Sequence, residues 1–234
     1  IFGYKKNNLS LQDIEFIFND LNFDFKKILV KKINKEIEIN GDINHKKLNF
    51  DKKNLELLIR PFFQKIDLRK LKLSSKNIFS LKLNDKFKFQ DFEIESQMYI
   101  DEAELVNNFD LKEFFPDNKK NITFSDNDLT IKYKNDDLSI IGKGNILYQK
   151  NNDFIIYNFK EKNSNLDFEI SLEIDKNPFL IPLLNYEKVN NEKTLIKFDG
   201  SKNKKDSIKI DTLNLTESKN KIQISKLIFK DKLE

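Results

Sequence analysis

Side chains that could bind a metal or act in catalysis are scattered along this sequence. His45, the only histidine, lies in the polar stretch INHKKLNF and has no second strong metal ligand at a recognisable spacing. Asp126 and Asp128 in SDNDLT resemble part of a calcium loop, but the glycine and distal glutamate of such a loop are missing. We therefore predict that His45 is exposed in a loop, that SDNDLT is a hairpin turn, and that the chain holds no metal.

Other catalytic chemistry is equally hard to place. The chain has no cysteine, which excludes disulfides and thiolate catalysis. Among 38 acidic residues a pair of carboxylates could be chosen almost anywhere, so no pair marks a hydrolase site. Gly142 and Gly144 in IIGKGNILY have no third glycine and strand-like flanks, which favours a bend or close backbone approach over a phosphate loop. We predict a protein that is not an enzyme and needs no cofactor.

The charge pattern argues against a specific nucleic-acid partner. The pI is 8.9, yet 42 Lys and Arg are interspersed with 38 acids and leave a net charge of only +4. Only Arg60 and Arg69 are arginines, the residue best suited to bidentate contacts with bases and phosphates.

The composition predicts a thin or drawn-out hydrophobic core. Of 234 residues, 38% are hydrophobic, against a usual value of about 45 to 50%, and 34% are charged, against about 25%. There is no apolar run of 18 residues, and no signal peptide precedes Ile1. We expect a piece of a longer polypeptide whose membrane anchor or export signal lies outside this chain.

Apolar residues alternate with polar ones over most of the chain, and clusters of Lys, Asn and Asp interrupt the alternation at intervals. This pattern predicts a mainly β fold, a long antiparallel meander over residues 26–234 of a single domain. Residues 1–25 are expected to form a helical entry, because Ser10 and Asp13 resemble a helix cap ahead of an apolar stretch. Short helical turns are expected near Asp110 and after Asn177.

A slipped alternation, in which two polar residues separate two apolar pairs, occurs four times. The copies are Ile66, Leu68, Leu71, Leu73; Phe87, Phe89, Phe92, Ile94; Ile208, Ile210, Leu213, Leu215; and Ile222, Ile224, Leu227, Phe229. One extra residue in a β-bulge would keep both pairs on one face and bend the strand. The alternative is a straight strand whose two halves are covered on opposite faces, as where two packed sheets cross.

If the bulges form, the sheet curls and keeps one apolar face that acts as a groove. Such a groove, rich in Phe, Ile and Leu, would accept acyl chains. The predicted lining residues are Phe87, Phe89, Phe92, Ile94, Ile208, Ile210, Leu213, Leu215, Ile222, Ile224, Leu227 and Phe229.

Residues 129–175, LTIKYKNDDLSIIGKGNILYQKNNDFIIYNFKEKNSNLDFEISLEID, then NPFLIPLLNY and the tandem slipped strands, resemble the AsmA-like proteins of the bacterial envelope, the group of AsmA, TamB and YhdP. The resemblance covers roughly residues 68–234 and implies a periplasmic segment anchored to the inner membrane through a part outside this chain. It further implies an elongated, curled β-sheet whose concave apolar face carries phospholipid acyl chains towards the outer membrane. The implied partners are phospholipid, or another acyl-chain lipid, and the remainder of the parent chain.

Two other functions fit the same residues. A compact β-sandwich, acting as an adhesin or an envelope scaffold, would use the alternation to fill an ordinary core. A hydrolase acting on polysaccharide in a β-rich fold is the more distant alternative.

Overall fold

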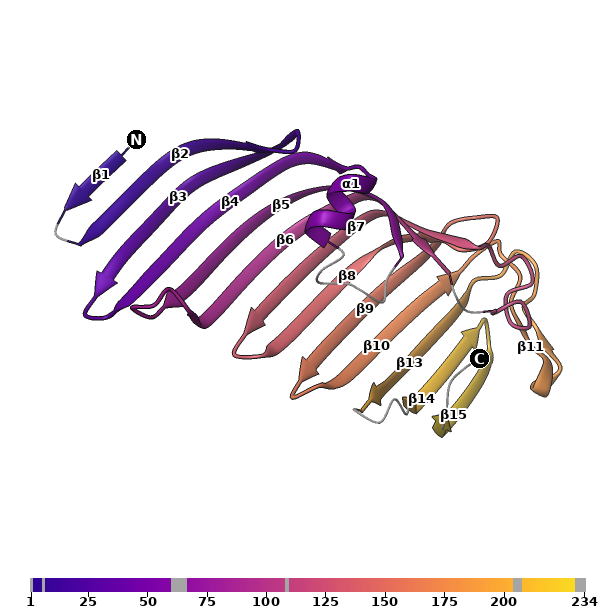
Figure 1. Ribbon diagram of the computed structural model, residues 1–234. Helices are drawn as coiled ribbons and strands as arrows, with labels where there is room; N and C mark the ends of the chain where they lie inside the picture. Colours follow the sequence, from indigo (N-terminus) through magenta and orange to yellow (C-terminus); the bar gives the residue numbers. More distant parts are fainter. Residues whose placement is uncertain (1, 6, 60–66, 108–109, 204–207, 230–234) are drawn as a thin grey trace.

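The computed structural model describes residues 2–5, 7–59, 67–107, 110–203 and 208–229. Thirteen strands form one antiparallel sheet in the order of the chain, and two short strands form a separate hairpin, as Figure 1 shows. The strands are β1 (Phe2–Lys5), β2 (Asn8–Phe18), β3 (Leu21–Ile33), β4 (Glu36–Phe50), β5 (Leu68–Leu83), β6 (Phe89–Val106), β7 (Asn121–Lys134), β8 (Asp137–Leu147), β9 (Asp153–Lys162), β10 (Asn165–Ile174), β11 (Leu180–Ile181), β12 (Tyr186–Glu187), β13 (Thr194–Lys202), β14 (Ile208–Glu217) and β15 (Asn220–Phe229). Helix α1 (Lys52–Asn54) continues into a π-helical turn, Leu55–Ile59, and a 3-10 helix spans Pro182–Leu184.

The sheet is open. Among the described strands, β1 and β15 lie at opposite ends of the row and do not pair with each other (Figure 1). The accessible surface is 16165 Å², whereas a compact monomer of 27.9 kDa would expose about 11,000 Å². The mainly β meander predicted from the alternation is therefore confirmed, and the alternative of a compact β-sandwich is wrong.

Asparagine and aspartate make the tight turns that glycine often makes elsewhere. The two-residue hairpin loops Asn19-Asp20 and Asn135-Asp136 have positive φ at both residues, which is the type I′ geometry that matches the twist of paired strands. No glycine in the described chain has a positive φ. The short polar side chains of Asn and Asp tolerate this conformation, so the polar clusters between apolar runs mark turns as predicted.

Three copies of the slipped alternation contain a bulge. Arg69 is skipped because Leu68 and Lys70 pair with consecutive residues of β6, and Gln90 and Asp211 are skipped in the same way. In β15, Lys226 has a φ of 61° and lies opposite Asp211, and neither residue is paired, so the register between β14 and β15 does not shift. The predicted bulges at Arg69, Gln90 and Asp211 are confirmed, and the fourth position is an unpaired residue with a left-handed backbone.

The register divides the sheet into an apolar and a polar face, because paired residues of an antiparallel sheet project to the same side. Leu71 pairs with Ala103, Ala103 with Phe124, and Phe124 with Ile146, and this side is called the apolar face from here on. Farther along the row it carries Ile155, Leu172, Ile196, Leu215 and Ile222. The opposite side, called the polar face, carries mainly Lys, Glu, Asp, Asn, Ser and Thr.

The predicted helical entry over residues 1–25 is wrong. Residues 2–5, 8–18 and 21–33 are strands, and Leu9, Leu11, Ile14 and Phe16 repeat the slipped alternation with Asp13 (φ 51°) at the bulge. Spacings of three residues between apolar positions suit a helix as well as a bulged strand, and here strand pairing with β3 decides.

Two further local predictions are corrected. Leu55, Leu57 and Ile59 lie within the predicted strand meander, but they form a π-helical turn after α1, whose first turn is capped by Asp51 (Asn54 N to Oδ1, 2.7 Å). The helical turn predicted after Asn177 begins only at Pro182. The predicted turn after Asp110 is confirmed, since the amides of Phe114 and Phe115 both donate to the carbonyl of Leu111.

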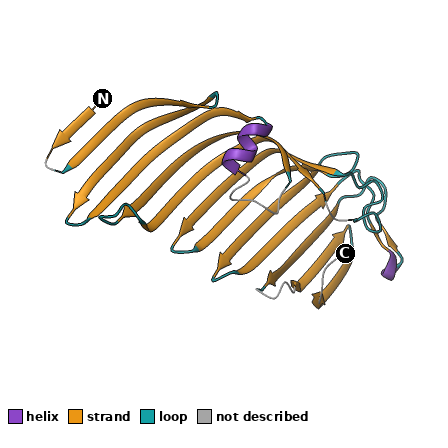
Figure 2. Ribbon diagram, viewed as in Figure 1, coloured by secondary structure: helices purple, strands orange, loops and turns teal. Residues whose placement is uncertain are grey.

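The connections at the two ends of the strands differ in length. One edge of the sheet carries mostly tight hairpins, such as those at Asn135 and Asn163, whereas the other carries the long segments 51–67, 107–120 and 175–193 (Figure 2). The strand ends with the tight hairpins are called the open edge, and the strand ends with the long segments are called the capped edge.

Candidate functional site: an apolar face covered along one edge

The first cover over the apolar face is the segment that follows β4. Leu55, at the start of the π-helical turn, is buried together with Leu48, Phe50, Leu71 and Leu73. A hydrogen bond from the side-chain amide of Asn54 to the carbonyl of Asn19 fixes this segment on the sheet. The ends of β4, β5 and β6 therefore have an ordinary closed core.

The second cover consists of two connections at the other strands. Phe179 packs on Ile174, Ile196 and Leu215, and the ring of Phe115 lies 5.2 Å from that of Phe179. The two segments are also joined through their backbones, because the amide of Leu180 donates to the carbonyl of Phe114 (2.9 Å). These connections close the capped edge of the sheet from β7 to β14.

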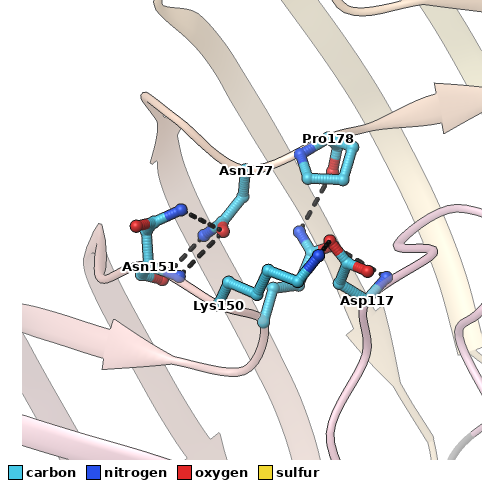
Figure 3. Close-up of polar contacts among 6 residues, drawn as sticks. Asp117, Lys150, Asn151, Asn177 and Pro178 are labelled. Carbon is cyan, nitrogen blue, oxygen red and sulfur yellow. Dashed lines mark hydrogen bonds and ion pairs between the residues drawn. The ribbon is translucent and has the colours of Figure 1, made fainter.

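Buried polar side chains fix the second cover in place. Asn177, which is 1% exposed, donates to the Asn151 carbonyl (2.7 Å) and accepts from the Asn151 amide (Figure 3). It also donates to Asp153 Oδ2 (2.6 Å). Gln149, also fully buried, donates to the Pro178 carbonyl and accepts from the amide of Asp117. Since an unpaired polar group is costly inside a protein, this network ties the cover to one position.

Burial also changes the acidity of this network. It raises the pKa of Asp153 even though Asn177 and the backbone of Asp175 donate hydrogen bonds to the carboxylate. It likewise raises the pKa of the Tyr148 hydroxyl. Both groups belong to the closed part of the sheet. Beside them, the ammonium group of Lys188 donates to the carbonyl of Asp175.

The remaining half of the apolar face, towards the open edge, is covered by no described helix or strand. This half is called the open strip. It contains Ile39 in β4, Phe79 and Leu81 in β5, Phe92 and Ile94 in β6, Ile131 and Tyr133 in β7, Ile140 in β8, Phe159 in β9, Phe168 in β10, Phe198 in β13, Ile210 and Leu213 in β14, and Ile224 and Leu227 in β15. Apolar side chains thus run across the sheet from strand to strand, most of them only partly buried.

The predicted groove residues belong to two parts of this face. Phe89, Phe92 and Ile94 lie at the start of β6, and Phe87 lies in the turn before it with a φ of 56°. The members on β14 are six strand spacings from β6, about 29 Å, and those on β15 are seven spacings away, about 34 Å. They are joined by strands β7 to β13, whose apolar residues the sequence showed as alternating but did not assign to the groove.

Individual groove residues differ in exposure. Phe87 and Phe89 are 72% and 73% exposed, whereas Leu215 is 1% exposed and belongs to the closed core under Phe179. Ile66 and the side chain of Phe229 lie outside the described residues. Leu215 is therefore a core residue.

Glycines lie where strands of the apolar face approach each other closely. A Cβ on Gly142 would stand 2.3 Å from the Tyr157 ring, and one on Gly200 would stand 2.1 Å from the Lys209 carbonyl oxygen. Both Gly142 and Gly144 lie within strand β8, as predicted. Close backbone approach is confirmed at Gly144, where a Cβ would stand 2.6 Å from the Cα of Asn127, whereas at Gly142 the near neighbour is the Tyr157 side chain.

Comparisons of this chain with protein-family models, with curated proteins and with solved structures gave no match. The function of the apolar face therefore has to be argued from its own geometry.

The prediction that His45 is exposed in a loop is wrong. His45 lies half-buried in β4, on the apolar face. Its Nδ1 is 2.8 Å from Ser75 Oγ, and the network continues to Asn77 and from there to Ser96 (2.7 Å). Lys46 and Lys47, which made the stretch look like a loop, form a bulge at which Lys47 has a φ of 54°. No local motif reveals this network, because strand register alone brings its members together.

Asp126 and Asp128 lie within β7, so the predicted hairpin turn at SDNDLT is also wrong. Asp126 has a φ of 53° and forms a bulge, and the buried Asn127 beside it donates to the carbonyls of Ser125 and Asn145. The described residues contain no group of three His, Cys, Asp or Glu side chains arranged to hold a metal ion.

The polar face pairs its lysines with acids across strands. Lys132 and Lys134 in β7 contact Glu95 and Glu93 in β6, and Glu102 contacts Lys70 at 2.8 Å. The hydrogen bond from Lys70 lowers the pKa of Glu102. Exposed pairs of this kind stabilise little, but they neutralise the lysines locally.

The sheet is also hollowed on its polar face. A depression of about 640 Å³ spans β3 to β7 and is lined by side chains such as Lys27, Ile78 and Glu93. A twisted sheet curves in both directions, so each face is concave along one of them. None of the helices in the described part of the chain has the length and apolarity needed to cross a membrane.

Proposed function

We propose that this chain binds the acyl chains of phospholipid, or of another acyl-chain lipid, on the open strip and conducts them within the bacterial envelope. The observation that carries the proposal is the one-sided sheet, whose apolar face is covered along one edge and left uncovered along the other. Exposing a row of apolar side chains on many strands to water is unfavourable, and soluble monomers rarely keep such a surface without a ligand or partner for it.

The shape of the open strip favours an elongated, flexible ligand. The strip is made of Ile, Leu, Phe and Tyr side chains that follow one another across the strands. Acyl chains can lie along such a surface and shift along it, because every position offers the same apolar contact.

The resemblance to AsmA-like envelope proteins supports the same ligand. It adds a periplasmic location, an inner-membrane anchor outside this chain and a role in outer-membrane biogenesis to the proposal. That the chain is not an enzyme remains a prediction.

The test compares lipid retention by three proteins. Phe92 belongs to the open strip, and Phe89 lies beside it on the apolar face at the start of β6. Their side chains are 36% and 73% exposed, so Phe89→Glu with Phe92→Glu should place charge on and next to the strip with little loss of folding. Ile78→Glu is the matched control, since Ile78 is 65% exposed on the polar face of the neighbouring strand β5.

Mass spectrometry of the purified proteins should find phospholipid or fatty acid on the wild type and on the Ile78 variant, and less on the double variant. A wild type that carries no lipid and also fails to bind a fluorescent fatty acid after purification would refute the proposed function.

A further inference from the structure

The polar network around His45 lies on the apolar face, at the border between the closed core and the open strip. On β5 the apolar face reads Leu71 and Leu73 in the closed core, then Ser75 and Asn77, then Phe79 in the open strip. Polar atoms at such a border are well placed to meet the polar end of a ligand whose tail lies on the strip.

The hydrogen bonds of the network fix which way each group points. Asn77 Nδ2 donates to the carbonyl of Ile43 (3.2 Å) and to Ser75 Oγ (2.9 Å), while Asn77 Oδ1 accepts from Ser96. The carbonyl of Ile43 can only accept, so the amide of Asn77 cannot be reversed without losing this bond.

The hydrogen bonds around Ser75 favour one tautomer of His45. Ser75 Oγ already accepts from Asn77, and among the described contacts its own proton has one acceptor, His45 Nδ1 at 2.8 Å. A neutral imidazole whose Nδ1 accepts carries its proton on Nε2. Burial lowers the pKa of His45, which favours this neutral form.

His45 Nε2 is a buried atom with no hydrogen-bond partner among the described residues. The ring of Phe23 stands edge-on to the imidazole, with the ring centroids 5.0 Å apart. Phe23 is partly buried and packs against the closed core. The Nε2 proton is therefore a donor that lies beside an aromatic ring at the margin of this core, and a ligand on the strip would reach it once Phe23 moves aside.

We propose that His45 Nε2 donates a hydrogen bond to the carbonyl oxygen of an acyl ester whose hydrocarbon tail lies on the open strip. This inference rests on the proposed function and narrows it to ligands that carry a carbonyl at the head of the chain. Ser75, Asn77 and Ser96 act as positioning residues, because they hold the imidazole in the tautomer that donates.

Two ligands and two variants test the inference. Methyl hexadecanoate and hexadecyl methyl ether have the same chain, and only the ester has a carbonyl. His45→Gln places an amide N–H near the position of Nε2, whereas the shorter amide of His45→Asn can replace Nδ1 but cannot reach as far. Affinities are measured by displacement of a fluorescent fatty acid from the delipidated protein.

The wild type and His45→Gln should bind the ester roughly three- to tenfold more tightly than the ether, and His45→Asn should bind the two equally. Equal binding of both ligands by the wild type, or the same preference in all three proteins, would overturn the role of His45 and leave the proposed function standing. Binding of neither ligand by the wild type would overturn both.

Nuclear magnetic resonance gives an independent measurement that needs no variant. Because His45 is the only histidine, the imidazole signals in a nitrogen-15 spectrum belong to it. They should show a neutral ring protonated on Nε2, and its proton signal should shift when the ester is added but not when the ether is added. A ring protonated on Nδ1 would contradict the inference.

Discussion

The capped and open halves of the apolar face are built from the same strands but differ in what lies above them. Along the capped edge, Leu55 and Phe179 come from long connections and bury residues such as Ile174 and Leu215 to 1% exposure or less. Along the open edge, the described hairpins, such as those at Asn135 and Asn163, are too short to fold back over the face. The length of the connections, more than the strand sequences, decides which half is core and which half is surface.

The largest expected effect separates the two halves directly. Leu215→Glu would bury a charge in the closed core and should lower the free energy of unfolding by about 4 kcal/mol or more, enough to unfold the sheet. Phe89→Glu, at a side chain that is 73% exposed, should leave the melting temperature nearly unchanged. Thermal melts and urea titrations measure both, and a comparable loss in the two variants would mean that the open strip is itself a covered core.

The open strip is uncovered, but neighbouring strands within it, such as β13 and β14, are tightly packed. A Cβ at Gly200 would meet the Lys209 carbonyl oxygen at 2.1 Å, and this contact with backbone cannot be relieved by rotating a side chain. Gly200→Ala should therefore destabilise the protein by roughly 2 to 3 kcal/mol. Gly3→Ala is the control, because its Cβ would come no closer than 4.0 Å to another atom. If urea titrations give equal midpoints, β13 and β14 are more loosely paired than the register indicates.

The stability of the second cover, which carries Phe179, should depend on the hydrogen bonds of Asn177. Asn177→Ala would leave Asp153 Oδ2 and the Asn151 carbonyl without their donor, at a cost of about 1 to 3 kcal/mol. Amide hydrogen exchange should accelerate across residues 176–189 and stay slow in β4 and β5. Asn158→Ala, on the polar face beside Glu169, should change neither. Uniform acceleration over the whole sheet would show that cover and sheet open as one unit.

Much of the fold could be predicted because a bulged strand shows an alternation of apolar and polar residues that is interrupted by one extra residue. The two polar residues between Ile210 and Leu213 break the alternation by one position, and one extra residue in the strand, Asp211, restores it. The same spacing from Leu9 to Phe16 also suits a helical face, so it does not distinguish the bulged strand from the helix predicted over residues 1–25. Pairing with β3 resolves the ambiguity, and pairing is not visible in a local pattern.

The border network could not be predicted for a related reason. His45 is surrounded in sequence by Asn44, Lys46 and Lys47, and its partner Ser75 is 30 residues away. Two residues of β4 are skipped between His45 and Leu48, and the resulting register turns the imidazole to the apolar face. Only the three-strand register of β4, β5 and β6 shows that these polar side chains meet.

The smallest expected effect concerns the border between the two halves and depends on pH. Burial lowers the pKa of His45 below its ordinary value of 6.5, while Asp24 opposes part of this change. Below pH 6.5 the unfolded chain therefore binds more protons at this residue than the folded chain does. The contribution of His45 to stability is present above that pH and is lost as the pH falls towards the folded pKa.

His45→Gln removes the only histidine. The free energy of unfolding of the wild type should therefore fall more steeply than that of the variant between about pH 7.5 and about pH 5. Urea titrations across this range measure the difference between the two slopes, in which the many carboxylates common to both proteins cancel. Parallel curves would mean that the imidazole is as well solvated in the folded sheet as in the unfolded chain, and the border would then be part of the open strip.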